Sequence, residues 1–251
     1  MTDRASAQIP EVPLNAEAVA SDAQTHGVVR VTSDGLDVQG FAAFMEELGE
    51  PMFTEGETPV PGFANLNIVT NVGRTTKPKS VFHSDTTYVR RPPKFSGLFA
   101  VDVPTSGGAT LFTDQYAAFD ALPASLRQLL LGATMRHAVT GLELGPEAER
   151  SARHPVVRRH PATGRDALYL TTPARCSELR LADGTDRSDL IDTLYSHSLG
   201  QIGRFKHLWA RGDILVWDNR CTLHAADHSE VVGDRTLYRA LVRGEPPEGA
   251  E

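Results

Sequence analysis

The segment FHSDTTY, residues 82–88, places an imidazole and a carboxylate two residues apart, at His83 and Asp85. Its β-branched and aromatic residues predict a strand, in which residues i and i+2 share one face with Cα atoms about 6.6 Å apart. Two donors at that separation can bind one metal ion. A His–Asp hydrogen bond is also a common structural device, so the pair alone does not establish a metal site.

A catalytic non-haem iron site takes two histidines and one carboxylate and leaves positions open for substrate and O₂. The best candidate for the second histidine is His224, in GDILVWDNRCTLHAAD, because it follows a strongly apolar run and precedes another predicted strand. His228, in the same segment, is the competing candidate. The other histidines lack a partner signature and are expected at surface or half-buried positions; they are His26, His137, His154, His160, His197 and His207.

The elements that must position these side chains are mostly short β-rich runs separated by turn signals. Predicted strands cover residues 28–31, 66–69, 81–88, 95–103, 135–139, 156–160, 167–170, 205–209, 214–217 and 236–242. Helical spacing occurs at residues 16–23, 41–48, 116–131 (around Pro123) and 190–199. No β-α-β rhythm is present, so the pattern favours a mainly β sandwich or barrel with the helices outside it.

The composition is that of an ordinary globular protein: 251 residues, 40% hydrophobic and 23% charged. We expect a flexible segment over residues 1–14, one domain over 15–245 and a tail over 246–251. Two cysteines exclude a disulfide scaffold or a Cys-rich zinc module, and a net charge of −7 gives no reason to expect nucleic acid. A reduced cytoplasmic protein without a membrane partner is expected, and homo-oligomerisation stays open.

Four stretches resemble the taurine dioxygenase family of Fe(II)- and 2-oxoglutarate-dependent oxygenases, which includes the phenoxyacetate herbicide dioxygenases. They occur in the family's order and are FHSDTTYVRRPPKFSGLFAVDVPTSGGATLFTDQYAAFDALP, HPVVRRHPATGRDALYL, GDILVWDNRCTLHAA and RTLYRALVRG. With a weaker match at GFAAFMEELGEP, the resemblance covers roughly residues 28–244. It implies a double-stranded β-helix, or jelly-roll, barrel with iron near one mouth.

The resemblance also implies roles for individual residues. The iron ligands of the family match His83, Asp85 and His224. The distal carboxylate of 2-oxoglutarate would bind Thr110 and Arg235, with a charge-assisted contact from the guanidinium. Arg239 matches a second arginine that meets anionic substrates, and positions 235 and 239 face the same way on a regular strand. Residues 217–219 (Trp-Asp-Asn) are expected to fix the loop before the distal histidine.

Departures from the family pattern concern the prime substrate. Where taurine dioxygenases bind the sulfonate with a histidine and a tyrosine, EPMFTEGE places Thr54 and Glu57. The segment KPKSVF lacks the family's asparagine, and a short stretch at 141–152 implies a smaller lid. Taurine is therefore not expected. The candidate substrate contacts are Thr54, Glu57, Thr86 and Arg239, with Arg239 indicating a carboxylate and Glu57 an amine as the alternative.

The chemistry that the resemblance implies is hydroxylation or desaturation of an unactivated C–H bond, with Fe(II) as cofactor and 2-oxoglutarate and O₂ as cosubstrates. Succinate and CO₂ would be the coproducts. An aspartate at position 85, rather than a small residue, disfavours halogenation. Two alternatives stay open: a zinc-dependent hydrolase or isomerase on a jelly roll, and a non-catalytic cupin-like binding module. A weak visible charge-transfer band from anaerobic Fe(II) and 2-oxoglutarate would separate the oxygenase from both.

Overall fold

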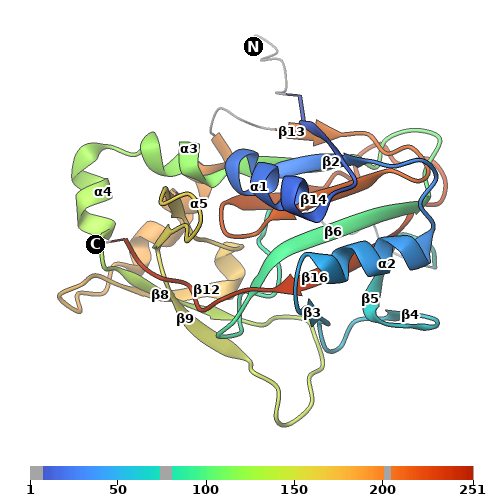
Figure 1. Cartoon of the computed structure of the whole chain (residues 1–251). Coiled ribbons are helices and arrows are strands. Elements are labelled where there is room, and N and C mark those ends of the chain that lie inside the picture. Colours follow the sequence, from blue (N-terminus) through green and yellow to red (C-terminus); the bar gives the residue numbers. More distant parts are fainter. Residues whose placement is uncertain (1–7, 74–80, 201–204, 251) are drawn as a thin grey trace.

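The computed structural model describes residues 8–73, 81–200 and 205–250. Its largest feature is an eight-stranded sheet with β14, β6 and β16 near the centre (Figure 1). The strand order is β1 (Glu11–Pro13), β2 (Val28–Thr32), β14 (Ile214–Asp218), β6 (Pro93–Asp102), β16 (Thr236–Arg243), β5 (Phe63–Thr70) and β4 (Pro59–Val60), and β3 (Pro51–Met52) pairs with β16. All neighbouring strands are antiparallel except for the β1–β2 pair.

A second, three-stranded sheet shares a hydrophobic core with the inner face of the large one. It consists of β13 (Phe205–His207), β7 (Thr110–Asp114) and β15 (Thr222–Ala226). Phe112 of this sheet packs in one cluster with Leu98 and Trp217 of the large sheet. The two-residue period of a strand then decides which residues can line a site between the sheets. On β6 the inward positions include Leu98 and its neighbour two residues away, Ser96.

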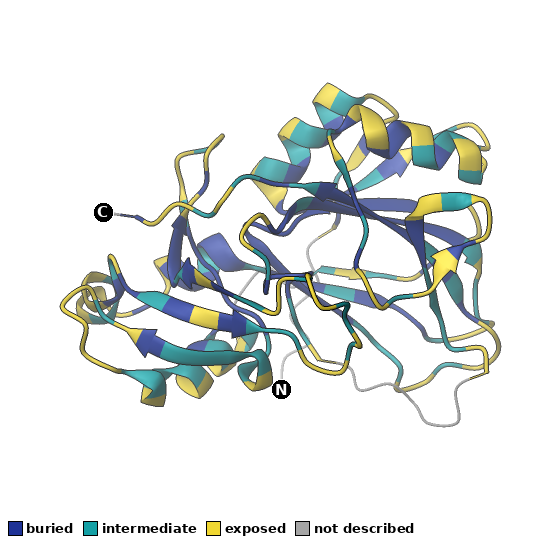
Figure 2. Cartoon of the chain, turned by 90° about the horizontal axis from the view of Figure 1, so that it is seen from below, coloured by how far each residue is buried: buried dark blue, intermediate teal, exposed yellow. Residues whose placement is uncertain are grey.

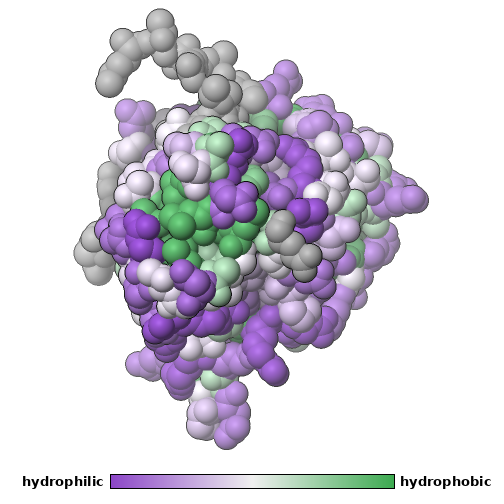
Figure 3. Space-filling model, turned by 90° about the vertical axis from the view of Figure 1, so that its left-hand side faces the viewer, coloured by the Kyte–Doolittle hydropathy of each residue, from purple (hydrophilic) through white to green (hydrophobic). Residues whose placement is uncertain are grey.

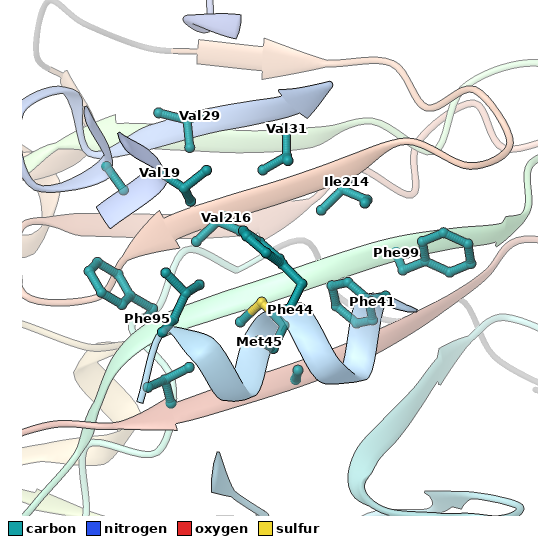
Figure 4. Close-up of a cluster of buried hydrophobic side chains, with 14 of the residues drawn as sticks. Val19, Val29, Val31, Phe41, Phe44, Met45, Phe95, Phe99, Ile214 and Val216 are labelled. Atoms are coloured by element: carbon teal, nitrogen blue, oxygen red, sulfur yellow. The ribbon is translucent and has the colours of Figure 1, made fainter. Parts of the chain in front are cut away.

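Two helices cover the outer face of the large sheet (Figure 4). They are α1 (Ala16–His26) and α2 (Val38–Glu47), and each begins at a side-chain N-cap, Asn15 and Asp37 respectively. Phe41 and Met45 of α2 press against the strand β6. Gly97 lies under them, where an added Cβ would come within 2.5 Å of the Met45 sulfur. A larger residue at this position would therefore force the Met45 side chain to move.

The remaining elements form a smaller lobe beside the two sheets. Its helices are α3 (Gln115–Asp120), α4 (Ala124–Leu130) and α5 (Ile191–Gly200), with 3₁₀ turns at Pro173–Arg175 and Ser188–Leu190. Its strands are β8 (Thr134–Ala138), β9 (Ser151–Pro155), β10 (Val157–Arg159), β11 (Asp166–Leu168) and β12 (Cys176–Arg180). Helices and strands share one apolar core. Figure 2 shows mostly buried strands in the large sheet, whereas β8 and β9 of this lobe carry buried and exposed residues along the same strand. The predicted mainly β class with outer helices is confirmed.

Several expectations about local structure need correction. Residues 81–88 form turns and one isolated bridge rather than a strand. Proline at position 123 divides the helix predicted over 116–131 into α3 and α4. Within the segment expected to be flexible, Glu11–Pro13 pair with β2, while residues 1–7 lie outside the described part. The tail also docks, because the Ala250 amide donates to the Val157 carbonyl at 3.1 Å. Residues 77–80 of KPKSVF lie outside the described residues.

The surface seen from the side of α3 and α4 is largely hydrophilic but includes an apolar area (Figure 3). Leu129 of α4 is among the exposed large hydrophobic residues, at 37%. Homo-oligomerisation, which the sequence leaves open, stays a prediction. Among the described helices, none is both long and apolar enough to cross a membrane.

Candidate active site

Two backbone hydrogen bonds bring together histidines that are far apart in the sequence. The His83 amide donates to the His224 carbonyl at 2.9 Å, and the His224 amide donates to the His83 carbonyl at 2.9 Å. This isolated antiparallel bridge sets the two imidazole centroids 4.3 Å apart. His224 is on β15, whereas His228 lies beyond the end of that strand. The structure therefore groups His224, and not His228, with His83 and Asp85.

Asp85 completes a cluster of three donors that fits one metal ion. Its Oδ1 lies 3.7 Å from His83 Nε2 and its Oδ2 lies 3.8 Å from His224 Nε2. These distances are too long for hydrogen bonds. Two donors that each lie about 2.1 Å from one ion are roughly 3 to 4 Å apart, which matches the observed separations. The clustering arises from the backbone bridge and a turn. The sequence therefore predicts the correct neighbours, although they do not lie on a strand as expected.

The electrostatic properties of Asp85 and His224 suit a cation. The His83 Nδ1–H donates to the Val81 carbonyl at 3.0 Å, which places the other ring nitrogen, Nε2, on the side of Asp85. Burial lowers the pKa of His224 to about 3, although Asp85 opposes this effect, so its ring is neutral at ordinary pH. Burial alone would raise the pKa of Asp85, but the Arg239 charge and the two histidines bring it well below its usual value. The neutral His224 imidazole thus lies beside an ionised carboxylate.

A buried hydrogen-bonded chain orients the Asp85 carboxylate. Ser96 Oγ donates to Asp85 Oδ2 at 2.7 Å and accepts from Asn219 Nδ2 at 2.7 Å. The Asn219 side-chain oxygen in turn accepts from Trp217 Nε1 at 3.1 Å. The expectation that residues 217–219 fix the loop before His224 agrees with these bonds. The Trp217 ring also packs on the His224 ring, with centroids 4.6 Å apart.

Arg235 and Thr110 form a second buried group next to this cluster. Arg235 Nε donates to the Gly108 carbonyl at 2.9 Å, and its Nη2 donates to Thr110 Oγ1 at 3.3 Å. Gly108 adopts φ +72°, and an added Cβ would lie 3.1 Å from Arg235 Cδ. Trp209, which the sequence analysis did not single out, donates from Nε1 to Thr110 Oγ1 at 3.0 Å. Since Thr110 already accepts twice, its own proton is available to an incoming acceptor.

The charge of Arg235 has no anionic partner within the described residues. Arg235 is 2% exposed, and the guanidinium contacts a carbonyl and a hydroxyl. Burial without a neighbouring carboxylate lowers its pKa to about 10. A buried unpaired guanidinium is costly, so this group is arranged for an anion that the protein itself does not supply.

Arg239, in contrast, already has two carboxylate partners. Its Nη1 donates to Asp85 Oδ1 at 3.1 Å and its Nη2 donates to Glu57 Oε2 at 2.5 Å. Arg235 and Arg239 both point inward, as the strand spacing predicts. The sequence leaves two partners open for Arg239, a protein carboxylate or an anionic substrate group, and favours the substrate. In this structure the Nη atoms bind two protein carboxylates, and the substrate contact stays a prediction.

Thr54 and Thr86 contact each other. Their hydroxyl oxygens lie 3.0 Å apart and both side chains are buried. Thr86 follows Asp85 directly and has φ +44°, a strained conformation for a β-branched residue. The hydrogen bond from the loop of Thr54 therefore braces the turn that carries Asp85. Their predicted contact with substrate stays a prediction.

The sequence of this chain matches a known protein family. The profile described as "Taurine catabolism dioxygenase TauD, TfdA family" matches residues 3–241. The chain belongs to this family. The resemblance drawn from the four sequence stretches to the taurine dioxygenase family is thereby confirmed.

Relatives within and around this family cover different shares of the chain. An alpha-ketoglutarate-dependent 2,4-dichlorophenoxyacetate dioxygenase from Cupriavidus pinatubonensis is 36% identical over 171 residues, 64% of this chain and 58% of the relative's length. An alpha-ketoglutarate-dependent sulfate ester dioxygenase from Pseudomonas putida is 30% identical over 86% of this chain and 76% of its own length. The crystal structure of a taurine dioxygenase from Burkholderia xenovorans superposes with a TM-score of 0.80, at 28% identity, covering 97% of this chain and 90% of that one.

Proposed function

We propose that this protein is an Fe(II)- and 2-oxoglutarate-dependent dioxygenase that hydroxylates or desaturates a C–H bond of a small molecule. The observation that carries the proposal is the buried, anion-free Arg235 beside the three-donor cluster. A metal ion that also binds a keto acid needs a charged partner for the acid's far carboxylate, and Arg235 with Thr110 supplies it. A zinc-dependent hydrolase would use the same three donors but gives Arg235 no role.

The donor set fits a divalent iron ion, since two imidazoles and one carboxylate are the ligands of non-haem iron oxygenases. His83, Asp85 and His224 would hold it. When bound, the iron would supply O₂ activation coupled to the oxidative decarboxylation of 2-oxoglutarate to succinate and CO₂. The protein contributes position and charge.

Each protein group has a defined part in that arrangement. The Ser96–Asn219 chain and Arg239 hold the two Asp85 oxygens and keep the carboxylate ionised. Arg235 and the Thr110 hydroxyl bind and orient the far carboxylate of the cosubstrate. The rings of Phe112 and Trp217 pack around His224 and exclude water from that side.

The architecture is proposed to be the family's double-stranded β-helix. The eight-stranded and three-stranded sheets enclose one core, which supports a jelly-roll arrangement. His224 on β15 and Arg239 on β16 come from the two different sheets. The site would then lie between them.

The prime substrate is proposed to be a small molecule. The relatives named above act on phenoxyacetates and sulfate esters, and an anionic group was predicted from Arg239. In this chain such a group would have to displace Glu57 from the guanidinium. Direct substrate contacts from Thr54 and Thr86 would require their mutual hydrogen bond to open.

Calorimetric titration of 2-oxoglutarate into the Fe(II)-loaded protein under anaerobic conditions tests the proposal. Arg235→Gln should weaken binding by about 2–5 kcal/mol, because a buried carboxylate loses its charged partner. The matched control is Arg243→Gln, which removes the arginine at the end of β16, the strand that follows Arg235, where it pairs with Glu50 at the surface. Equal affinity in wild type and Arg235→Gln would contradict the proposal.

A further inference from the structure

Glu57 occupies the side of Arg239 where an anionic substrate group would bind. Both Nη atoms of Arg239, the fork that chelates carboxylates and sulfonates, donate to protein carboxylates, one to Asp85 and one to Glu57. The remaining Nε atom is buried and has no hydrogen-bond partner in the described part of the chain. The Nε–H is therefore uncommitted, whereas each Nη already donates one N–H to a protein carboxylate.

The turn that carries Glu57 is anchored on two sides. The Glu57 amide donates to the Thr54 carbonyl at 3.3 Å, and the Thr54 hydroxyl is bonded to Thr86, next to Asp85. Gly56 in the same turn has φ +84°, and an added Cβ there would lie 2.8 Å from the Glu143 carbonyl oxygen. The backbone thus holds Glu57 at the site, and its side chain is only 26% exposed.

The formal charges at the site, once the metal and cosubstrate of the proposed function are bound, indicate the effect of the Glu57 carboxylate. Asp85 and Glu57 together carry two negative charges against one positive charge on Arg239. A divalent ion adds two positive charges, the 2-oxoglutarate dianion removes them, and Arg235 adds one. The loaded site is then neutral. Without Glu57 it would carry one positive charge, ready for an anionic substrate.

A cavity of about 160 Å³ is lined by Thr86, the residue after Asp85, and by Tyr88. Part of its lining is apolar, from Met52, Phe53, Val89 and Leu144, and two carboxylates, Glu55 and Glu149, also line it. Among the described lining residues the one cation is Arg243, which is paired with Glu50 at 2.8 Å.

We propose that Glu57 is the specificity-determining residue of the site, selecting a prime substrate that presents an uncharged or cationic hydrogen-bond donor and rejecting carboxylates and sulfonates. A hydroxyl, amide N–H or ammonium can bond to Glu57 while the Arg239 pair stays intact. An anion at the Nη atoms of Arg239 competes with Glu57 for the guanidinium and brings a second negative charge beside that carboxylate, which is disfavoured.

The test compares three probes that differ only in the end group: phenoxyacetate, 2-phenoxyacetamide and 2-phenoxyethylamine. Their affinities are measured by anaerobic calorimetry on the protein loaded with Fe(II) and 2-oxoglutarate. Glu57→Gln keeps the shape and removes the charge. It should bind phenoxyacetate at least about tenfold more tightly than wild type, and 2-phenoxyethylamine at least about tenfold more weakly.

The matched control is Glu11→Gln, which removes a carboxylate from a similar arrangement away from the site. There Arg30 bridges Glu11 and Asp213 at 2.5 and 3.1 Å, as Arg239 bridges Glu57 and Asp85. Glu11→Gln should leave all three probe affinities unchanged. If the Glu57→Gln substitution destabilises the fold, Glu57→Ala is measured in the same way.

The assignment is overturned if removing the Glu57 charge does not increase the affinity for phenoxyacetate. It is also overturned if neither the wild type nor the Glu57 variant binds phenoxyacetate. An equal gain in Glu11→Gln overturns it too. Failure of the proposed function has a different signature, since the visible Fe(II)–2-oxoglutarate band would then be missing from the wild type before any probe is added.

Discussion

Replacing Ser96 with alanine should loosen the metal site without removing a ligand. The Ser96 hydroxyl donates to Asp85 Oδ2 and accepts from Asn219 Nδ2, and all three side chains are buried. The substitution therefore leaves one carboxylate oxygen and one amide N–H without partners in a dry environment. Asp85 Oδ1 keeps its contact with Arg239, so the carboxylate stays charged but gains freedom to rotate.

The size of the effect follows from those two lost bonds. A hydrogen bond to a charged group contributes about 1.5–3 kcal/mol, and an orphaned buried amide costs about 1–3 kcal/mol. The first loss bears on the orientation of Asp85 and the second mainly on the stability of the fold. Loss of a group that orients a metal ligand typically lowers metal affinity by about 10–100-fold. Asp85→Ala, which removes the ligand itself, should abolish binding.

The assay is anaerobic Fe(II) titration of wild type and Ser96→Ala, with unfolding curves for each protein. Ser198→Ala is the control, because Ser198 is also fully buried but bonds to the Leu194 carbonyl in α5, away from the site. We expect a loss of stability in both variants and a loss of Fe(II) affinity only in Ser96→Ala. Unchanged Fe(II) affinity in Ser96→Ala would refute the reasoning that Asp85 is held by this hydroxyl.

Two further predictions concern the cosubstrate and pH. Thr110→Val removes the hydroxyl proton available to the far carboxylate, so calorimetry should give 2-oxoglutarate binding weaker by about 1.5–3 kcal/mol; wild-type affinity would argue against the contact. His137 is fully buried, and burial, with His154 next, lowers its pKa to about 3, below the unfolded value near 6.5. The unfolded chain therefore binds a proton that the folded chain does not, and the free energy of unfolding should fall by about 1.4 kcal/mol for each pH unit below about 6.5. His137→Phe should reduce that slope in denaturant titrations between pH 6.5 and 5, and an unaltered slope would contradict this origin.

The sequence predicts the type and order of most elements, because strands and helices leave local patterns. The spacing of Arg235 and Arg239 correctly indicates that both side chains point inward, Arg239 from β16 and Arg235 from the residue before it. The segment around His83 shows the limit of such patterns. Its β-branched residues favour a strand, yet it forms a bridge and turns, because its pairing with His224 is a contact between distant segments.

The partners of the site residues are not visible in local patterns for the same reason. Glu57 reaches Arg239 across 182 residues of sequence, and Asn219 reaches Ser96 across 123. Because Glu57 is a second carboxylate partner, Arg239 is one member of an ion-pair network rather than a free anion-binding group. Only the folded arrangement of the two sheets and the loop at Thr54 brings these groups together.

The most direct test of the central claim is the visible spectrum of the protein mixed anaerobically with Fe(II) and 2-oxoglutarate. The account predicts a weak charge-transfer band that grows to saturation with one 2-oxoglutarate bound for each iron. At a 2-oxoglutarate concentration that saturates the wild type, Arg235→Gln should give a much weaker band, and Asp85→Ala should give none. A wild-type protein that binds Fe(II) but develops no band at any 2-oxoglutarate concentration would contradict the assignment of this site to a 2-oxoglutarate-dependent dioxygenase.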